Sequence, residues 1–247
     1  MTQASLYGER AKIGLVIPSN NTVIEPEMWA MRPAGVTVHG NRILTRGNTP
    51  EGIVEMEKSS AQAAGELGHG RMSVIAYACL ATSLVKGVAW SRAVARQITA
   101  DTGCAATTAA TATLEALQAL KVKQIAVVSP YPEHIQALLP AYFAQCGFDV
   151  VSTRNMGIQN SLELWKIPGA QVRAFATAVD VPEAEALCIV ATDLPTIAEI
   201  DWLERELGKP VVTTNQAILW KSLLLAGIDD PIEDYGTLLQ QSRKILQ

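Results

Sequence analysis

Short apolar segments alternate along this chain with stretches of helical periodicity, and this alternation constrains the fold most. The apolar segments are rich in valine and isoleucine, and each is short enough for a single strand. This order is typical of α/β proteins with a mostly parallel sheet. We predict strands at 12–18, 36–43, 72–79, 104–108, 124–130, 149–156, 186–192 and 210–215, and helices at 50–67, 85–101, 110–120, 133–146, 170–180, 195–207 and 216–226.

The two halves of the chain resemble each other. "IGLVIP" at 13–18 matches "IAVVSP" at 125–130 with an offset of 112 residues, and "TTAATATLEAL" at 107–117 resembles "TTNQAILWKSL" at 213–223 with an offset of 106. We therefore expect two pseudo-symmetric α/β lobes, residues 1–120 and 121–247, each a small and mostly parallel sheet flanked by helices. The C-terminal helices could pack back on the first lobe. Because ligands of open α/β sheets bind beyond the carboxyl ends of the strands, we expect the active site in the cleft between the lobes.

Composition argues against several classes of partner and site. The formal net charge is −4 over 247 residues, and no basic run offers a surface for nucleic acid or an anionic membrane. The polar start "MTQASLYGERAK" lacks the apolar core of a signal peptide, and no apolar stretch reaches the roughly 20 residues of a membrane span. The four cysteines have no metal-ligand or disulfide spacing, and no glycine-rich phosphate motif is present. We expect a cytoplasmic protein whose site needs neither cofactor nor metal.

Cys79 is the strongest candidate for a reactive side chain. It ends an apolar segment in "YACLATS", and Thr82 and Ser83 follow where a helix is expected to begin. The N–H groups and the dipole at a helix N-terminus favour a thiolate. Cysteine is also among the most often buried residues and can act as a small apolar side chain, so the position alone leaves both interpretations open. The repeat offset places Ala191 opposite Cys79.

Polar turns follow the equivalent strands of the two halves. "PSNNTVIEPE" contains Ser19 and Asn21, whose neutral donors suit a carboxylate or phosphate and equally suit turn and capping bonds. In "SPYPEH", Tyr131 is expected to project its phenol into the cleft or to pack as a half-exposed side chain. In "ATDLPT", capping is the expected role of Asp193. Since these motifs contain no Arg or Lys, we expect the ligand to be held by neutral donors.

Taken together, these segments resemble the aspartate/glutamate racemase superfamily, in particular its maleate cis-trans isomerase and arylmalonate decarboxylase branch. The resemblance runs from Ile13 to about Tyr235 and rests on "GLVIPSNNTVIEPEM", "YACLATS", "SPY", "ATDLPT" and "GKPVVTTNQAILW" in that order. It implies a cofactor-independent enzyme that acts on a small carboxylate. We also expect a homodimer or a higher homo-oligomer.

The resemblance also implies roles for individual residues. Cys79 matches the first-lobe cysteine of the isomerases, Asn21 their turn asparagine and Tyr131 their second-lobe tyrosine. Asn160 in "GIQNS" matches, across a gap, a further asparagine that contacts a substrate carboxylate. The remaining predicted substrate contacts are the turn residue Ser19 and the backbone N–H groups of Leu80 and Thr192.

Isomerases of this kind are described as adding the cysteine to C2 of maleate, after which the adduct rotates about C2–C3 and expels the thiolate to give fumarate. Covalent addition turns the double bond into a single bond, so the rotation becomes easy. The developing enediolate needs hydrogen-bond donors that are already in place. The resemblance therefore implies cis-trans isomerisation of a maleate-like dicarboxylate through Cys79.

One position departs from the family. The second-lobe cysteine falls on Ala191, which disfavours a racemase, because a racemase needs a thiol on each face of its substrate. Arylmalonate decarboxylase keeps only the second-lobe cysteine, so its activity is disfavoured as well. Ala191 is either natural or an engineered replacement of cysteine that traps a ligand. Decarboxylation or hydrolysis of a small carboxylate by Cys79, and non-catalytic carboxylate binding, stay open as alternatives.

Overall fold

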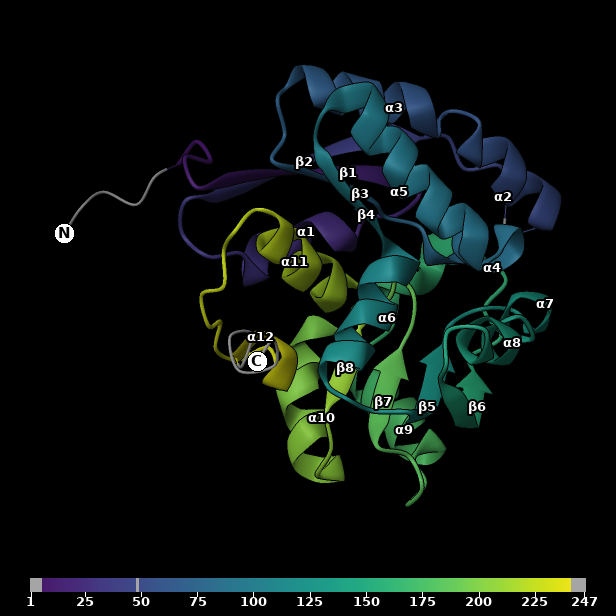
Figure 1. The fold of residues 1–247 in the computed structure, drawn as a ribbon. Helices are drawn as coiled ribbons and strands as arrows, with labels where there is room; N and C mark the ends of the chain where they lie inside the picture. Colours follow the sequence, from purple (N-terminus) through teal and green to yellow (C-terminus); the bar gives the residue numbers. More distant parts are fainter. Residues whose placement is uncertain (1–5, 48, 241–247) are drawn as a thin grey trace.

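Two parallel sheets form the framework of the protein, one from each half of the chain (Figure 1). The structure is a computed structural model that describes residues 6–47 and 49–240. In the order β2-β1-β3-β4, the first sheet contains β1 (Ala11–Pro18), β2 (Val36–Ile43), β3 (Val74–Tyr77) and β4 (Ala105–Thr108). The second sheet, in the order β6-β5-β7-β8, contains β5 (Gln124–Ser129), β6 (Asp149–Asn155), β7 (Ala186–Ile189) and β8 (Val211–Thr213). The predicted two-lobed α/β fold is confirmed.

The strand registers show the same repeat as the sequence. Just beyond the end of β3, the N–H of Ala78 donates to a carbonyl of β1, and just beyond the end of β7 the N–H of Val190 donates to a carbonyl of β5. The two donors are 112 residues apart (190 − 78). Cys79 and Ala191 are the next residues along the chain, so they occupy equivalent positions in the two lobes.

The helices after β4 and β8 begin in the same way. The side chain of Thr108 accepts the N–H of Thr111 at the start of α6 (Ala109–Ala119), and Thr213 accepts the N–H of Gln216 at the start of α11 (Thr214–Leu225). Each bond satisfies an N–H that the helix itself leaves unpaired. The two caps lie 105 residues apart (213 − 108), one residue less than the offset of 106 that the sequence alignment suggests.

Helices cover both faces of each sheet (Figure 1). The outer face of the first sheet packs against α3 (Ser60–His69) and α5 (Val88–Thr102), and that of the second against α9 (Gly169–Val179) and α10 (Ile200–Leu207). On the inner side, α1 (Ile24–Met31) and α11 contact each other. The other helical segments are α2 (Pro50–Glu57), α4 (Leu80–Lys86), α7 (Glu133–Gln136), α8 (Leu139–Ala144), α12 (Thr237–Gln240) and the 3-10 turns η1 (Ser161–Lys166) and η2 (Ile197–Glu199).

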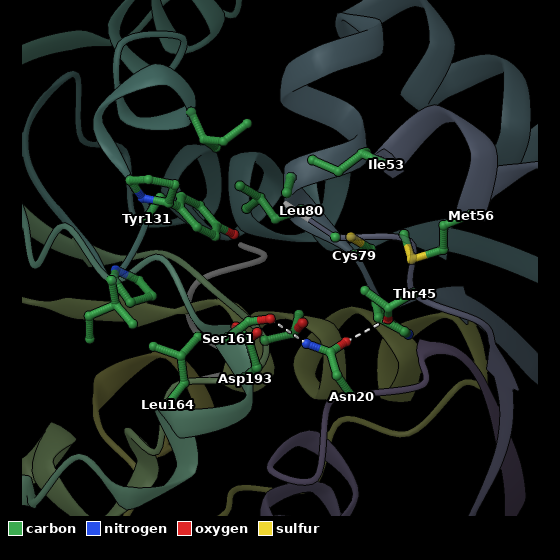
Figure 2. Close-up of a pocket in the computed structure, with 18 residues that line it drawn as sticks. Asn20, Thr45, Ile53, Met56, Cys79, Leu80, Tyr131, Ser161, Leu164 and Asp193 are labelled. Atoms are coloured by element: carbon green, nitrogen blue, oxygen red, sulfur yellow. Dashed lines mark hydrogen bonds between the residues drawn. The ribbon is translucent and has the colours of Figure 1, made fainter. Parts of the chain in front are cut away.

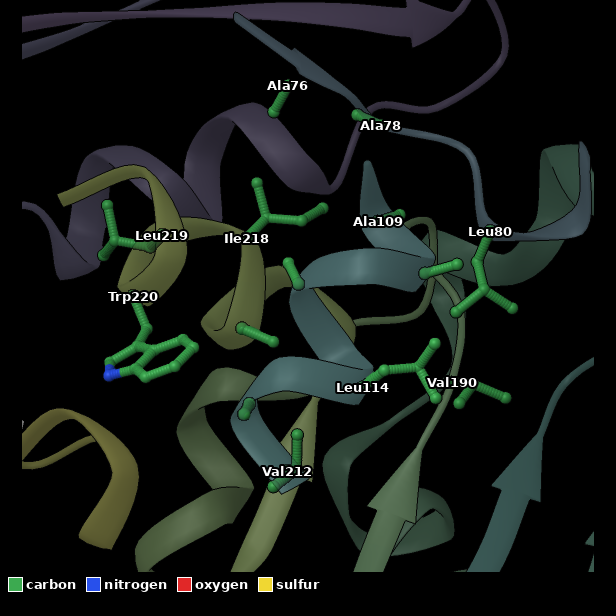
Figure 3. Packing of buried hydrophobic residues seen from close by; sticks show 14 of the residues in the cluster. Ala76, Ala78, Leu80, Ala109, Leu114, Val190, Val212, Ile218, Leu219 and Trp220 are labelled. Carbon is green, nitrogen blue, oxygen red and sulfur yellow. The ribbon is translucent and has the colours of Figure 1, made fainter. Parts of the chain in front are cut away.

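The largest buried cluster joins the two sheets through α6 and α11 (Figure 3). It includes Ala78 just after β3, Val190 just after β7, Val212 of β8, Leu114 of α6 and Ile218 of α11. Although α11 follows the second sheet in the chain, it packs on β3 and β4 of the first. The division of the chain at residue 120 stays a prediction of the sequence. No helix of the described chain has the length and apolarity that a membrane span requires.

Candidate active site

One pocket lies where the carboxyl ends of the strands of both sheets meet, with a cavity of about 50 Å³ (Figure 2). Loops that follow β1, β2 and β3 form one side, and loops that follow β5, β6 and β7 form the other. This is the place that the open-sheet rule predicts. The lining residues are Pro18, Asn20, Thr45, Gly47, Ile53, Met56, Cys79, Leu80, Ala81, Pro130, Tyr131, Pro132, Ile135, Ile158, Ser161, Leu164, Thr192 and Asp193.

The walls of this pocket are mostly apolar. Ile53 and Met56 project from α2, Ile135 from α7 and Leu164 from η1, and Leu80 starts α4. Among the described residues that line the pocket there is no Arg, Lys or His. A carboxylate would therefore find no cationic side chain there. Its hydrogen bonds to neutral donors would be electrostatically stronger in this water-poor environment than in bulk water, whereas an ionised Asp193 on the same lining would repel it.

Cys79 occupies the N-cap position of α4 without a side-chain capping bond and presents its sulfur to the pocket. The hydroxyl of Thr82 donates to Sγ at 3.2 Å, and Thr82 in turn accepts the phenol hydrogen of the buried Tyr77. Burial raises the pKa of the Cys79 thiol, although the Thr82 hydroxyl and the backbone N–H groups of Thr82 and Ala81 act in the opposite direction. Burial therefore outweighs the effect of the helix start, and the resting group is the thiol.

Asp193 lies on the same pocket two residues after Ala191, the counterpart of Cys79. The predicted capping role is wrong, because the residue that precedes η2 is Thr196 and no side chain caps that turn. Within the described chain, only the backbone N–H of Asp193 itself is a hydrogen-bond donor to its carboxylate. Burial raises the pKa of Asp193 to about 6. The side chain is thus a carboxyl group that changes protonation near neutral pH and faces the space where a ligand would sit.

The charge of Asp193 should cost folding free energy. Its pKa of about 6 in the folded protein exceeds the ordinary 3.8, so stability falls as the pH rises between these two values, and above pH 6 the folded state bears the full cost of the buried charge. We expect Asp193→Asn to raise the free energy of unfolding at pH 8 by about 2 kcal/mol, and this gain should vanish below about pH 4, where the acid is neutral in both states. Urea unfolding at the two pH values measures the difference. A gain that persists at low pH would contradict the assignment, and Asp149→Asn at the exposed start of β6 is the control.

Tyr131 approaches the pocket from the loop after β5, as the sequence predicts. Its phenol oxygen points across the pocket toward Leu80 (Figure 2). Burial and the nearby Asp193 and Cys79 raise the pKa of the phenol well above 10. Tyr131 therefore keeps its proton and is suited to donate a hydrogen bond.

Asn20 lines the pocket, whereas the predicted Asn21 does not. The Nδ2 of Asn20 donates to Ser161 at 2.7 Å, and its Oδ1 accepts the hydroxyl of Thr45 at 2.7 Å (Figure 2). The amide of Asn21 is buried and donates to Thr192 at 3.0 Å, while its Oδ1 accepts two N–H groups at the start of α1. Asn20 thus links the loops of the two lobes at the pocket through Thr45 and Ser161. Asn21 links them beneath the pocket through Thr192.

The other predicted site residues lie at different depths. Leu80 and Thr192 line the pocket, and the Thr192 hydroxyl donates to the carbonyl of Ala78 at 3.1 Å. Ser19 and Asn160 line an adjoining surface hollow, where the Asn160 side chain accepts the N–H of Leu162 at 3.2 Å and so caps η1. Ala191 is buried just behind Thr192 and is not among the lining residues. Their roles toward a ligand stay predictions.

Glu27 on α1 fixes the loop that carries Thr192 and Asp193. One carboxylate oxygen accepts the N–H groups of Thr196 at 2.6 Å and Ile197 at 3.1 Å, and the other accepts Nδ2 of Asn215 at 2.7 Å. The same Nδ2 donates to the carbonyl of Thr192 at 3.1 Å. Burial raises the pKa of Glu27, and these three donors oppose that change. The loop after β7 is thus held in place from the first lobe.

Removing this carboxylate should destabilise the fold strongly. Glu27→Ala leaves buried donors of Thr196, Ile197 and Asn215 without their acceptor, so we expect a loss of about 3 kcal/mol in the free energy of unfolding. Thermal and urea unfolding measure the loss. Glu25→Ala on the same helix removes a partly exposed ion pair with Arg42 and should cost at most about 1 kcal/mol. Equal losses in the two variants would contradict the role given to Glu27.

Comparisons with known proteins find relatives over most of the chain. A family model described as arylmalonate decarboxylase matches residues 13–239. The maleate isomerase of Pseudomonas putida is 30% identical over 244 residues, which cover 92% of this chain and 96% of that protein.

Two solved structures are informative about the site. The Nocardia farcinica maleate cis-trans isomerase, as a cysteine-to-serine mutant with a covalently bound succinylcysteine intermediate, superposes with a TM-score of 0.88 and 28% identity, covering 94% of this chain and 98% of that one. The maleate isomerase Iso of Pseudomonas putida, as a cysteine-to-alanine variant with maleate, superposes with a TM-score of 0.89 and 25% identity, covering 93% and 97%.

Proposed function

This chain belongs to the arylmalonate decarboxylase family, and we propose that it isomerises a small cis-unsaturated dicarboxylate of the maleate type to the trans form by covalent addition of Cys79. The observation that carries the proposal is the sulfur of Cys79, which lies on a pocket between the two lobes beside the phenol of Tyr131. The covalent succinylcysteine in the Nocardia farcinica relative supports the same chemistry here.

The proposed reaction begins with the Cys79 thiolate. The sulfur forms a bond to C2, and the electron pair of the double bond moves to C3 and onto the adjoining carboxylate as an enediolate. The Tyr131 phenol and the backbone N–H groups of Leu80 and Thr192 are candidates to stabilise this charge. Rotation about the new C2–C3 single bond, return of the electron pair and loss of the thiolate give the trans acid.

Proton NMR of the protein with maleate tests the proposal directly. Fumarate has its own olefinic signal, so its appearance supports isomerisation. Loss of a carboxyl group from maleate, or unchanged maleate at high protein concentration, would overturn it. Iodoacetamide labelling adds a second measurement, since Cys79 lines the pocket and maleate should protect it, whereas maleate should not change the labelling of Cys104 and Cys188, which do not line it.

Decarboxylation of an aryl-substituted or alkyl-substituted malonate is the second candidate, and the apolar walls of the pocket favour it. Ile53, Met56 and Leu164 could enclose an apolar substituent, and the same water-poor surface raises the free energy of a bound carboxylate that is to be lost as carbon dioxide. Phenylmalonate offered beside maleate distinguishes the two reactions. Release of carbon dioxide with no fumarate would favour this candidate.

A cytoplasmic location and a homo-oligomeric state complete the proposal. All four cysteines are free, which suits a reducing compartment. Light scattering of the purified protein tests the oligomeric state, and a monomeric mass would count against it.

A further inference from the structure

The enediolate of the proposed isomerisation can take up a proton at C3 before the rotation, and the following inference rests on that proposed function. Addition of sulfur to C2 leaves an electron pair on C3. The succinyl group of the covalent intermediate in the Nocardia farcinica relative is saturated, so in that protein the equivalent carbon has taken up a proton. In this chain the residue equivalent to Cys79 in the second lobe is Ala191, whose methyl group can neither give nor accept a proton. On this route a different side chain must therefore supply and remove a proton at C3 in this chain.

Among the described residues that line the pocket, three have a titratable side chain: Cys79, Tyr131 and Asp193. Cys79 is occupied as the nucleophile. Burial strengthens the hold of Tyr131 on its proton, so the phenol is a poor acid. Asp193 is left, and within the described chain no other residue engages its carboxylate by a hydrogen bond, unlike Glu27, which binds three donors.

The position of Asp193 suits proton transfer at C3. It belongs to the loop after β7 of the second lobe, whereas Cys79 follows β3 of the first lobe, so the two side chains reach the pocket from opposite lobes (Figure 2). A substrate that lies between them would present one face to the sulfur and the other to the carboxyl group. Glu27 fixes the loop of Asp193 through Thr196 and Ile197, so the carboxyl group is held on a rigid support.

We propose that Asp193 delivers a proton to C3 of the Cys79 adduct and removes a proton from C3 when the trans product forms. In the first step the Cys79 sulfur bonds to C2, and the electron pair of the double bond takes the proton of the Asp193 carboxylic acid at C3. In the last step the Asp193 carboxylate takes a hydrogen from C3, the C–H pair re-forms the double bond, and the C2–S pair leaves as thiolate. No oxidant or other reactant is consumed.

The protonation state of the pair is suitable at neutral pH. Since the pKa of Asp193 is about 6 and that of Cys79 lies above its ordinary value, the two groups together hold one proton over a wide range. Transfer of that proton from the thiol to the carboxylate produces the thiolate and the acid that the first step requires. An acid with a pKa near the working pH can both donate and accept.

The geometry of addition makes a distinctive prediction about hydrogen. If sulfur and Asp193 act on opposite faces, removal of the hydrogen just delivered regenerates maleate. Only after rotation about C2–C3 does the original hydrogen of C3 face Asp193, and its removal gives fumarate. Fumarate formed in D2O should therefore carry deuterium on carbon. Rotation of an enediolate that is never protonated would give fumarate without deuterium.

The test compares the full-length wild type with Asp193→Asn, using maleate in D2O, with proton NMR for the product and mass spectrometry for its deuterium. We expect wild-type fumarate to be deuterated, and Asp193→Asn to form fumarate about 10²- to 10⁴-fold more slowly. The fumarate that this variant does form should carry much less deuterium than fumarate from the wild type. Asp193→Ala should behave in the same way, and its thermal unfolding and that of Asp193→Asn check that both variants fold. Asp149→Asn, at the amino end of β6 and far from the strand ends that form the pocket, is the matched control.

The outcomes separate the two proposals. Deuterium-free fumarate from the wild type, or an Asp193→Asn turnover within about 3-fold of the wild type, would overturn the role of Asp193 and leave isomerisation intact. A wild type that forms neither fumarate nor a Cys79 adduct of the mass of maleic acid would overturn the isomerisation itself, and the role of Asp193 with it.

Discussion

Cys79→Ser is expected to lower fumarate formation by on the order of 10³-fold or more. A serine hydroxyl is almost wholly protonated at neutral pH and is a far weaker nucleophile toward a carbon–carbon double bond than a thiolate. No histidine lies among the described residues that line the pocket, so none of them is a base for the serine hydroxyl. Initial rates from proton NMR with maleate measure the effect, and intact-protein mass spectrometry should show that the adduct is lost with the activity.

Cys104→Ser is the matched control for this experiment. Cys104 is buried in the first lobe just before β4, and it does not line the pocket. Its replacement should leave the rate within about 3-fold of the wild type at a modest cost in stability. If Cys79→Ser kept a tenth or more of the wild-type rate, Cys79 would be a packing residue at a strand end and not the nucleophile.

The inner strands β1, β3, β5 and β7 could be predicted because they are buried almost throughout and read as nearly continuous apolar runs. The β2 prediction has the observed bounds of 36–43, and β5 and β6 each end one residue before the predicted end. The repeat was visible for the same reason, since equivalent strands need similar runs. Its offset of 112 also identified Ala191 as the counterpart of Cys79, which the strand registers reproduce.

The helices were less predictable where short local signals compete. The segment 24–31 reads as part of a polar turn because it contains Pro26 and follows an asparagine pair, yet α1 forms there and buries Ile24, Met28 and Met31. The predicted helix at 85–101 is two helices, because Gly87 adopts a φ of 87° that ends α4 and begins α5. Burial of its apolar side chains determines that α1 is a helix, and the backbone angle of Gly87 determines where α4 ends. Hydrophobic periodicity reports neither.

The site was predictable where a strand end alone decides a position. Cys79 and Tyr131 follow β3 and β5, and both reach the pocket. Which asparagine of the pair lines it was not predictable, because the turn after β1 sends Asn21 inward to Thr192 and leaves Asn20 at the surface of the pocket. The capping role predicted for Asp193 was wrong, because the turn η2 begins after Thr196 and not after Asp193. Only the structure shows where this turn begins.

The residues that form the apolar walls of the pocket could not be predicted from the sequence. Ile53 and Met56 come from α2, and Ile158 and Leu164 from the segment after β6, far away in the chain. Nothing in their local pattern separates a pocket wall from a core position. Only the packing of the two lobes brings these side chains together around Cys79.

The second large effect is expected from a thiol at position 191. In the Asp193→Asn background, Ala191→Cys should raise fumarate formation about 10²-fold or more, because the new thiol can take over proton transfer at C3 from the second lobe. In the wild type the same change should alter the rate by less than about 10-fold, since Asp193 already supplies the proton. Rates for the four proteins, measured by proton NMR with maleate, give the coupling between the two positions.

Ala191→Ser is the control for size, because its hydroxyl is close to a thiol in volume but gives and accepts protons poorly near neutral pH. Ala191 is only 2% exposed, so either side chain adds atoms to a packed region and should cost about 1–3 kcal/mol of stability. Rescue of Asp193→Asn by cysteine and not by serine would therefore reflect proton transfer and not packing. Equal behaviour of the two would mean that position 191 does not reach the reacting carbon. A large gain from Ala191→Cys in the wild type would mean that Asp193 is an inefficient acid, and that the alanine limits the rate.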